Sequence, residues 1–491
     1  MSSPAHVVAA QIAARTVTRP QRGTSLSKTI IVGMSTLIDL LIVVGIGIAI
    51  YFIYKPDSLL SQTRYMVVIG IYTAALLQGF HHAGLYRFSS IIHPLRQIAK
   101  ITWISSIVFL LMIGIAFALK ISADFSRVWA FAWLILSIIP LAGSRIALAA
   151  LVKRWSRKGL LTRNVVIYGA GDQGASLVEY ISRLDEPWNR IIGVFDDRVK
   201  RRAGKELAGF HVLGNTGDLF DYVREHRIDE ILIAVPWNSE KRIIEIVRLF
   251  APLPVNIRLS SDIVGTEFQQ HSIGLNFGIP MLNILDKPVT GWEAVIKNAF
   301  DYILGAVILV LSLPLMALIA IAIKLESKGP LFFHQKRYGF NHKLIEVCKF
   351  RTMYIDLQDN NAEQLTTRND PRVTRVGAVL RRLSLDELPQ LCNVLKGEMS
   401  VVGPRPHAIS AKAGGRLYGD VVDDYAARHR VKPGITGWAQ VNGWRGNTEH
   451  EEDIKNRVAH DIYYIENWSV LFDLYIVFRT IGTVLFGRNS Y

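Results

Sequence analysis

Long apolar segments dominate the first third of the chain. Four of them run roughly over Ile30–Tyr54, Tyr65–Tyr86, Ile101–Leu119 and Val128–Leu151. Each is close to the about 20 residues that a helix needs to cross a bilayer. Basic residues lie between the second and third segments and after the fourth, which places those loops in the cytoplasm. We therefore expect a four-helix transmembrane bundle over residues 29–152, with a cytoplasmic region after it.

Two features of the N-terminal region are less clear-cut. Residues 1–28 are rich in Ser, Ala and Arg and carry no cleavage-site pattern after a short apolar core, so we interpret them as a cytoplasmic tail. Asp39 lies inside the first apolar segment, where an acid can be functional. Its position near the cytoplasmic end, within reach of water or headgroups, favours a non-catalytic role.

After the fourth segment the composition becomes that of a soluble domain. A strand leads into a GxGxxG turn formed by Gly169, Gly171 and Gly174, a helix follows, and the next strand ends at Asp196. This order is typical of a Rossmann-like domain, in which the turn approaches a pyrophosphate and the acid binds a ribose. The same glycines also allow a helix to pack closely on a sheet. We expect a Rossmann-like (CoA-binding-like) domain over residues 160–262, either ligand-free or binding a nucleotide.

A further apolar run, Tyr302–Ile323, follows a linker over residues 263–296. The run is long enough to span a bilayer, but a crossing would carry the basic segments after it to the outside. Ser312 and Pro314 lie near its middle, where proline removes a helical hydrogen bond and serine can satisfy a freed backbone group. A helix broken there can enter and leave by the same face, which is the alternative to a fifth span.

Composition and charge agree with a membrane protein. Half of the 491 residues are hydrophobic, 20% are charged, and the mean hydropathy is +0.25. The net charge of +15 fits an anionic lipid surface and phosphate-bearing substrates. No nucleic-acid partner is expected, because the chain has no basic module with interleaved aromatic residues and no zinc-ligand spacing. Cys348 and Cys392 form neither a disulfide framework nor a CxxC metal pair.

Two adjacent carboxylates, Asp386 and Glu387, precede a short apolar helix. Its expected apolar stripe is Leu388, Leu391 and Leu395, and Gly397 would end it. Pro389 is tolerated only in the first turn of a helix, so Asp386 lies at the N-cap or just inside it. Ser384 and Glu387 have the spacing of a capping box. Simple capping is therefore the structural alternative to a chemical role.

The surrounding charges favour a chemical role. Arg381, Arg382 and Arg405 flank the pair, and a helix N-terminus also attracts anions. An ionised Asp386 beside gathered phosphates is a candidate nucleophile. Glu387 lies about 100° further round a helix, so the two carboxylates could share a divalent cation that bridges to the substrate.

Four longer motifs carry a resemblance to a known family. KFRTM at 349–353, LSLDELPQL around Asp386, MSVVGPRP at 399–406 and KPGITGWAQVNG at 432–443 resemble the bacterial sugar transferase family. Its members are polyprenyl-phosphate hexose-1-phosphate transferases, also called monotopic phosphoglycosyl transferases. The resemblance covers about residues 297–491. The whole layout is similar to that of the large members, which include undecaprenyl-phosphate glucose phosphotransferases.

The resemblance implies a fold and an activity. The fold is that of a membrane protein, α plus α/β, with a four-helix bundle, a Rossmann-like middle domain and a mainly helical catalytic domain over 297–491 that includes a re-entrant membrane hairpin at 300–324. The implied reaction, of EC class 2.7.8, moves a hexose 1-phosphate from a UDP-sugar to undecaprenyl phosphate and releases UMP. Glucose is the preferred hexose and galactose the next. The product would start an exopolysaccharide or capsule.

The resemblance also implies roles for particular residues. Asp386 would be the nucleophile, and Mg²⁺ would bind Glu387 and Asp386. Phosphates would be held by four cations, Lys349, Arg351, Arg381 and Arg405. Gln440 and Asn442 would read the nucleotide or sugar, although a glycine-punctuated turn is their simpler role. The enzyme would lie in the bacterial inner membrane with its catalytic domain in the cytoplasm, and family analogy suggests a homodimer.

Two other classes of protein match parts of the pattern. A membrane-anchored NAD-dependent sugar-nucleotide dehydratase would need a Tyr-x-x-x-Lys pair beside its cofactor. The only such spacing is Tyr51 to Lys55, at the end of an expected span, which argues against that class. A membrane scaffold with a sensory nucleotide domain leaves the motifs between 349 and 443 unexplained.

Overall fold

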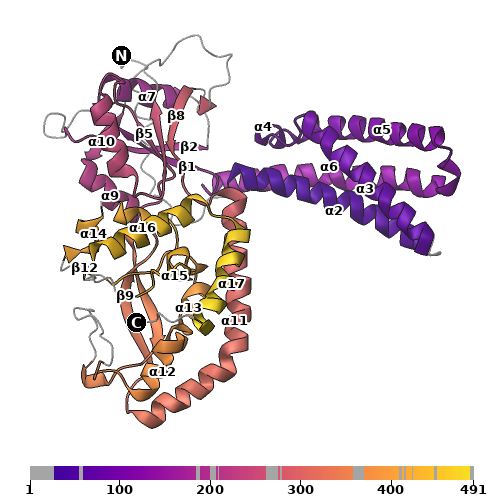
Figure 1. Cartoon of the computed structure of the whole chain (residues 1–491). Coiled ribbons are helices and arrows are strands. Elements are labelled where there is room, and N and C mark those ends of the chain that lie inside the picture. The colour runs from indigo at the N-terminus through magenta and orange to yellow at the C-terminus, as the bar shows by residue number, and fades with distance from the viewer. Residues whose placement is uncertain are drawn as a thin grey trace. The chain divides into compact units, whose positions relative to one another are not determined.

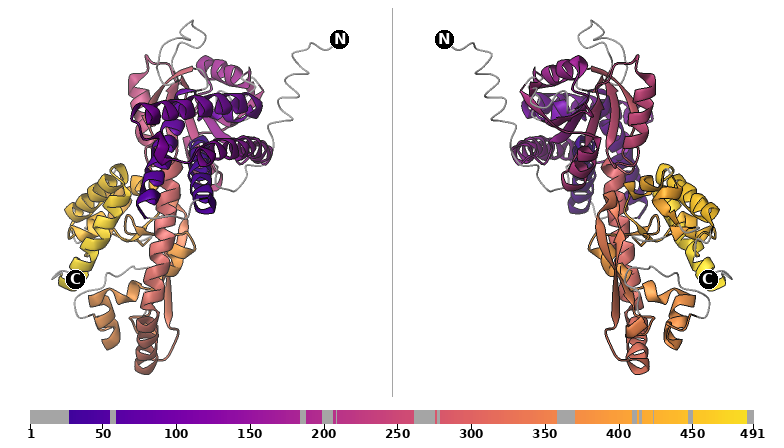
Figure 2. Two further views of the ribbon diagram at one scale, coloured as in Figure 1. Left: turned by 90° about the vertical axis from the view of Figure 1, so that its right-hand side faces the viewer. Right: turned by 90° about the vertical axis from the view of Figure 1, so that its left-hand side faces the viewer.

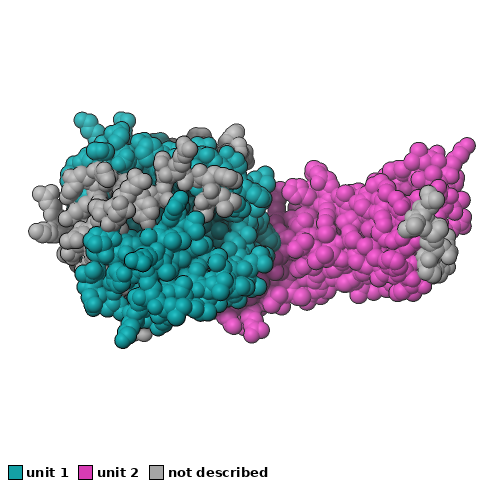
Figure 3. Space-filling model, turned by 60° about the horizontal axis from the view of Figure 1, so that its bottom comes forward, with its two compact units in different colours: residues 1–22, 164–491 teal, residues 23–163 magenta. Residues whose placement is uncertain are grey.

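The computed structural model describes residues 27–54, 59–183, 188–198, 206–207, 209–260, 275–276, 279–357, 370–408, 412–413, 416–422, 424–446 and 450–486. These residues belong to two compact units, which divide between Arg163 and Asn164 (Figure 3). The tail expected over residues 1–28 lies almost wholly outside the described residues.

The smaller unit is the helical bundle that the apolar segments predict (Figure 1). Its four long helices are α2 (Lys28–Tyr54), α3 (Leu59–His82), α5 (Pro94–Ala118) and α6 (Arg127–Arg157). The short α4 (Phe88–Ile91) and η1 (Ser122–Asp124) lie in the connections. Among the described helices, four have the length and apolarity to cross a membrane, namely α2, α5, α6 and α11 of the larger unit. The chain is a membrane protein.

A buried polar cluster joins two helices of the bundle. Asp39 on α2 forms an ion pair with Arg145 on α6, and both side chains are almost fully buried. The Tyr86 hydroxyl donates to Asp39 at 2.9 Å, and Arg145 also donates to Ser35. Because an unpaired charge inside an apolar bundle is costly, these contacts give Asp39 a structural role in pairing α2 with α6.

The larger unit begins with an α/β domain. Its eight-stranded sheet has the order β3-β4-β2-β1-β5-β6-β8-β7. The strands are β1 (Arg163–Tyr168), β2 (Asn189–Phe195), β3 (Glu206–Leu207), β4 (Phe210–Gly214), β5 (Glu230–Ile233), β6 (Asn256–Ser260), β7 (Leu275–Asn276) and β8 (Ile279–Leu285). β1, β5 and β6 run parallel, and β8 joins β6 antiparallel. The region expected to be a linker, 263–296, therefore contributes β7 and β8 to this sheet.

Helices cover both faces of the sheet. α7 (Asp172–Arg183) packs on one face through Leu177 and Ile181. α9 (Thr216–Glu225) and α10 (Glu240–Phe250) pack on the other face, through side chains such as Leu219 and Phe250. Strands covered on both sides need continuous apolar sequence, which is why β1 and β5 are fully apolar at their buried centres.

The long helix α11 (Gly291–Glu326) leads into the catalytic domain. Its N-terminal part packs against α13, β11 and α17, and its C-terminal part packs against α12. Between Gly305 and Ile319 none of its residues is buried. Pro314 lies inside the helix, and the Ser312 hydroxyl donates to the Leu309 carbonyl at 3.0 Å. α11 is one helix that changes direction toward its C-terminal end (Figures 1 and 2), not two helices, and the re-entrant hairpin stays a prediction.

The remainder of the catalytic domain mixes short helices with small sheets. Its elements are β9 (Phe332–Tyr338), η2 (Phe340–His342), β10 (Leu344–Phe350), η3 (Ile355–Leu357), α12 (Arg375–Leu383), η4 (Leu385–Glu387), α13 (Gln390–Leu395), β11 (Ser400–Val402), β12 (Lys412–Ala413), β13 (Arg416–Leu417), α14 (Tyr418–Val421), η5 (Tyr425–Arg430), β14 (Gly434–Thr436), α15 (Trp438–Val441), α16 (Glu451–Glu466) and α17 (Val470–Phe486). β9 and β10 form a hairpin, and β11 pairs with β14 in parallel. These two pairs position the cations of the site.

Candidate active site

The two carboxylates lie in a tight turn between two helices. α12 ends at Ser384, whose left-handed backbone (φ 59°) redirects the chain into the single turn η4. Asp386 and Glu387 occupy η4, and α13 starts after Pro389. The Ser384 side chain caps neither helix and instead accepts a hydrogen bond from Arg445. The capping-box alternative is therefore wrong, and the Glu387 side chain is engaged elsewhere.

Apolar side chains of α13 hold this turn against the core. Leu391 and Val394 are buried, and Leu388 packs near α11. Gly397 ends the segment with φ +79°, as the sequence predicts, since this backbone conformation strains residues with a Cβ. Leu395, expected on the apolar stripe, is exposed, and Val394 takes the buried place.

Glu387 is the hub of an ion-pair network. It accepts from Arg405 Nη2 at 2.6 Å and Nη1 at 3.1 Å, a two-pronged contact that carboxylates and guanidinium groups favour. It also accepts from Lys349 Nζ at 2.8 Å. Asp386 meets Lys349 only at 3.9 Å. Glu387 is therefore locked in place, whereas most of the lone pairs of Asp386 remain available.

The environments push the pKa values of the two carboxylates apart. Burial raises the pKa of Asp386 above 3.8; Lys349 opposes that rise, and the neighbouring charge of Glu387 adds to it. Burial alone would also raise the pKa of Glu387, but Arg405 and Lys349 hold it well below 4.5. Adjacent carboxylates with separated pKa values are typical of catalytic sites, where each group has a different task.

More cations surround the pair than the sequence analysis identified. Burial lowers the pKa of Lys349 and of Arg445, and it lowers that of Arg337 to about 10. Both Arg337 and Arg445 interact electrostatically with Glu387 and Asp386. Arg337 comes from the β9 strand and Arg445 from the turn after α15, so no local spacing links either of them to the carboxylates. Arg445 lies just after the last quoted motif, whereas Arg337 lies near none of them, so its position in the sequence carries no such signal.

The structure separates the expected phosphate-binding cations into three groups. Lys349 and Arg405 contact the carboxylates directly. Arg381 donates to the Thr352 hydroxyl at 2.8 Å and is close enough to lower the pKa of Asp386. Arg351 is buried and donates to the Ser327 and Lys328 carbonyls, where it holds the chain that leaves α11. The structure thus does not bring Arg351 to the pair.

Gln440 and Asn442 make contacts within their own turn. Gln440 donates to the Ile435 carbonyl at 3.2 Å and Asn442 to the Trp438 carbonyl at 2.8 Å. Asn442 also accepts from Arg479 at 3.1 Å. These contacts fit the simpler role, that of shaping a glycine-punctuated turn, and a contact with nucleotide or sugar stays a prediction.

A second buried layer supports the turn that carries Arg405. Arg428 Nη2 donates to the Arg405 carbonyl at 2.7 Å. It also lies 2.6 Å from Asp461, as an ion pair that lacks hydrogen-bond alignment. Arg457 donates to the Gly446 carbonyl at 2.6 Å, next to Arg445. The backbone around both arginines near Glu387 is thereby tied to α16 and η5.

The glycine turn of the middle domain has a packing role. Gly169 has φ +117°, and a Cβ there would collide with the Ala234 carbonyl of the neighbouring chain segment. Gly171 opens the turn into α7, and Gly174 is buried inside that helix. Asp196 accepts from Ala170 N at 2.8 Å, so it binds the turn itself. A nucleotide at this site stays a prediction.

The donor set can be compared with the needs of Mg²⁺. Among the described residues, no three His, Cys, Asp or Glu side chains gather as a metal site. Mg²⁺ commonly binds one or two carboxylates and completes its shell with water and substrate phosphates. Both oxygens of Glu387 already accept hydrogen bonds, while Asp386 is little engaged. The pair fits a Mg²⁺ that arrives with a phosphate substrate.

Comparisons with known proteins identify the family to which the chain is similar. The family model for bacterial sugar transferases matches residues 292–487, and that for a CoA-binding domain matches residues 81–261. The UDP-glucose:undecaprenyl-phosphate glucose-1-phosphate transferase of Escherichia coli K12 is 37% identical over 74% of this chain and 76% of its own. The undecaprenyl-phosphate glucose phosphotransferase of Komagataeibacter xylinus is 39% identical over 67% of this chain, which spans 60% of that relative.

A relative with a different named sugar also matches. The UDP-N-acetylgalactosamine-undecaprenyl-phosphate N-acetylgalactosaminephosphotransferase of Aeromonas hydrophila is 43% identical over 42% of this chain and 47% of its own. The shared region is thus common to members that differ in sugar. With a family model over the catalytic domain and relatives that match across most of its length, this chain is a membrane enzyme of the bacterial sugar transferase family.

Proposed function

We propose that the enzyme transfers glucose 1-phosphate from UDP-glucose to undecaprenyl phosphate and releases UMP. The observation that carries the proposal is the buried, little-engaged Asp386 beside a Glu387 locked by Lys349 and Arg405. The names of the E. coli and K. xylinus relatives support glucose as the sugar. UDP-galactose is the second choice, and an exopolysaccharide or capsule is the proposed product.

The chemistry would proceed in two displacements. A carboxylate oxygen of Asp386 attacks the phosphorus attached to the sugar, the bond to the other phosphate breaks, and UMP leaves with that electron pair. An oxygen of undecaprenyl phosphate then attacks the same phosphorus, and Asp386 leaves as a carboxylate. Arg405 and Lys349 stay paired with Glu387 in both steps and face the transferred phosphate with positive charge.

Mg²⁺ is proposed as the cofactor, held by Asp386 and the remaining acceptor site of Glu387 together with substrate oxygens. When bound, it would neutralise phosphate charge as a Lewis acid. Glu387 orients Lys349 and Arg405, so its neutralisation should weaken both the cation arrangement and the response to Mg²⁺. Glu387→Gln is expected to slow turnover and to raise the Mg²⁺ concentration needed for half-maximal rate. An unchanged Mg²⁺ requirement would contradict this assignment.

A panel of labelled UDP-sugars tests the substrate. Full-length enzyme in nanodiscs with undecaprenyl phosphate should release UMP fastest from UDP-glucose, more slowly from UDP-galactose, and not without Mg²⁺. Turnover of UDP-galactose but not of UDP-glucose would overturn the choice of glucose.

Asp386→Asn tests the nucleophile. The amide keeps the shape of the side chain but removes the charge and the nucleophilic lone pairs, so UMP release should disappear. UDP-glucose labelled in the sugar-linked phosphate, given without lipid acceptor, should leave label on the Asp386 peptide of the unaltered enzyme only. Normal turnover by the variant, or label on another peptide, would exclude the covalent route.

The re-entrant hairpin is proposed from the way α11 is anchored. Gly305 packs on Val394 of α13, and Ile319 packs in a cluster with Leu380 of α12, so both ends of the apolar middle contact one domain. The 14 residues between these anchors extend about 21 Å as a helix. That is less than the about 30 Å hydrocarbon core. A spanning α11 would place parts of one packed domain on opposite sides of the bilayer.

Cysteine labelling in inverted and right-side-out vesicles tests this topology. Cys348 and Cys392 are first replaced by Ala, and Phe332→Cys is introduced at an exposed position after α11. Reagent should reach it only from the cytoplasmic face. Ser122→Cys, in the exposed connection between α5 and α6, is the control for the opposite face. Labelling of Phe332→Cys from outside would mean that α11 spans the bilayer.

The proposed location is the bacterial inner membrane with the catalytic domain in the cytoplasm, where UDP-sugars are made. The same labelling experiment reports this orientation. A homodimer is proposed from family analogy, and mass measurement in native nanodiscs that finds only monomer would refute it.

A further inference from the structure

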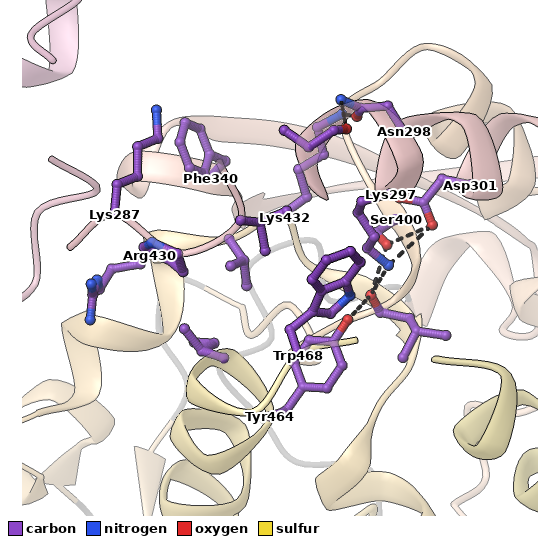
Figure 4. A pocket seen from close by; sticks show the side chains of 16 residues that line it. Lys287, Lys297, Asn298, Asp301, Phe340, Ser400, Arg430, Lys432, Tyr464 and Trp468 are labelled. Atoms are coloured by element: carbon purple, nitrogen blue, oxygen red, sulfur yellow. Dashed lines mark hydrogen bonds and ion pairs between the residues drawn. The ribbon is translucent and has the colours of Figure 1, made fainter. Parts of the chain in front are cut away.

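A cavity of about 160 Å³ lies at the N-terminal end of α11 (Figure 4). Because one water molecule needs about 10–15 Å³ of such a volume, the cavity has room for on the order of ten non-hydrogen atoms. Its walls come from the segment that enters α11, the first turns of α11, η2, and the segments around 400–402, 430–432 and 464–468. Apolar side chains, among them Ala294, Val431, Ile465 and Trp468, contribute to this lining. None of the carboxylates or cations of the catalytic pair lines it.

One side of the cavity is a polar cluster of one lysine and two carboxylates. Lys297 Nζ lies 2.7 Å from Asp473 and 3.3 Å from Asp301. Asp301 also accepts from the Ser400 hydroxyl at 2.8 Å, and Tyr464 donates to Asp473 at 2.8 Å. Figure 4 shows Lys297, Asp301 and Ser400 of this cluster together on one side of the view. Its single cation is outnumbered by two carboxylates, so this side of the cavity does not favour an anion.

Three other cations line the cavity without an acidic partner. Among the described residues, no carboxylate lies within ion-pair distance of Lys287, Arg430 or Lys432. Arg430 is about nine-tenths buried, donates to the Asp286 carbonyl, and has an Nε with no hydrogen-bond partner. Lys432 donates only to the amide oxygen of Asn298, at 3.0 Å. Figure 4 places Lys287 and Arg430 on the side opposite the polar cluster.

The directions of the pKa shifts of these cations agree with burial without a nearby counter-charge. Burial lowers the pKa of Lys287, of Arg430 and of Lys432. The acids that oppose the shift are more distant: Asp229 acts on Lys287, Glu466 on Arg430 and Asp301 on Lys432. An anion near these cations would stabilise their charged forms, because opposite charge offsets desolvation.

We propose that this cavity binds an organic phosphate, with its apolar part between Ala294, Val431 and Trp468 and its phosphate facing Lys287, Arg430 and Lys432. A phosphate suits the site better than a carboxylate because three unpaired cations, one of them a guanidinium, can offset a double negative charge. The site is separate from the catalytic pair, and the proposal is independent of the sugar and lipid substrates.

Two sources of such a phosphate are compatible with the surroundings. A soluble phosphate ester can enter from the cytoplasm. An anionic phospholipid can insert part of its body, because Val295 and Leu471, next to the cavity-lining Ala294 and close to Trp468, are exposed apolar side chains. Basic pockets near membrane helices commonly bind anionic lipid headgroups.

The test uses hexyl phosphate, whose eleven non-hydrogen atoms match the cavity in size. Its binding to the full-length enzyme in phosphatidylcholine nanodiscs is measured by isothermal titration. Ala294→Phe fills the cavity and should weaken binding tenfold or more, while Val295→Phe at the exposed neighbouring position should change it less than twofold. Lys432→Gln should also weaken binding tenfold or more, while Lys343→Gln, at an exposed lysine outside the cavity, should not.

The outcomes separate the proposal from binding elsewhere. Equal affinity in all four variants would place hexyl phosphate at the catalytic site or on the surface and overturn the proposal, as would the absence of binding. Nanodiscs with phosphatidylglycerol distinguish the sources. If a lipid is the natural ligand, hexyl phosphate should bind more weakly in phosphatidylglycerol nanodiscs. Native mass spectra should then show phosphatidylglycerol retained by the wild type and not by Ala294→Phe. Unchanged binding in both lipids identifies a soluble ester.

Discussion

Neutralising each carboxylate of the pair should change stability in opposite directions. Glu387 accepts three charge-assisted hydrogen bonds from two largely buried cations, whereas Asp386 has one contact at 3.9 Å. In Glu387→Gln, Arg405 and Lys349 would stay buried without their anion. Removing one partner of a buried ion pair costs about 3–5 kcal/mol. An amide oxygen can still accept one hydrogen bond, so we expect Glu387→Gln to destabilise the fold around the site by about 3 kcal/mol, the lower end of this range.

Asp386→Asn should have the reverse effect. The folded pKa of Asp386 lies above its unfolded value of 3.8, so its ionised form destabilises the fold at neutral pH, and this cost vanishes below that unfolded value. The folded pKa of Glu387 lies below its unfolded value of 4.5, so its charge stabilises the fold above pH 4.5 and loses this effect as pH falls through the folded pKa. Asp386→Asn should therefore be neutral or stabilising, by up to about 2 kcal/mol.

Amide hydrogen exchange over α13 measures the difference where it arises, since the intact membrane enzyme does not unfold in a single step. In EDTA, Glu387→Gln should speed exchange of the 390–402 peptide on the order of 100-fold, because about 1.4 kcal/mol is tenfold. Asp386→Asn should leave it unchanged or slower. Glu346→Gln, at an exposed carboxylate on β10, is the matched control and should have no effect. Equal effects of the two variants, or the reverse order, would refute the assignment of Glu387 as the hub.

Three further outcomes follow from named contacts. Asp461→Asn leaves Arg428 as a buried unpaired cation behind Arg405, so local opening of η5 and α16 should become easier by about 3–5 kcal/mol and KM for UDP-glucose should rise, as amide hydrogen exchange and initial rates would show. Gly403→Ala would put a Cβ 2.6 Å from the Lys432 carbonyl, so about 1–3 kcal/mol of overpacking should lower the melting temperature. Protonation would disable Asp386 as the proposed nucleophile, and burial raises its pKa, so kcat/KM should fall tenfold per pH unit below a midpoint above 3.8. Because the charge of Glu387 adds to that rise, an acid limb that persists in Glu387→Gln at a lower midpoint would assign the limb to Asp386.

Features that depend on neighbouring residues in the sequence were predicted well. The four apolar segments are helices, although α3 ends at His82 instead of Tyr86 and α6 continues to Arg157. Gly397 ends α13 as expected, because its positive φ is a local requirement. The motifs indicated the carboxylate pair and named Lys349 and Arg405 as phosphate-binding cations, and the structure brings both cations onto Glu387.

Features that depend on distant contacts were not predicted. Nothing near Ser384 indicates that Arg445 takes its hydroxyl, so the capping box was a reasonable but wrong alternative. Arg351 lies two residues from Lys349 and shares its motif, yet the chain turns after β10 and sends it to the carbonyls after α11. The strands β7 and β8 lie in a segment with glycines and prolines that resembles a linker, and only pairing with β6 makes them part of the sheet.

The charge balance around the pair explains why a phosphate substrate belongs there. Five cations, Lys349, Arg337, Arg381, Arg405 and Arg445, interact electrostatically with the two carboxylates, so the site carries about three more positive than negative charges. Burial lowers the pKa of Arg337 to about 10, which measures how poorly its charge is matched. A diphosphate brings about two negative charges to this excess. In the proposed reaction, esterification would leave the Asp386 carboxyl uncharged, and the second displacement would release it as a carboxylate. The same cations would favour this second step, because they stabilise the anion that it restores.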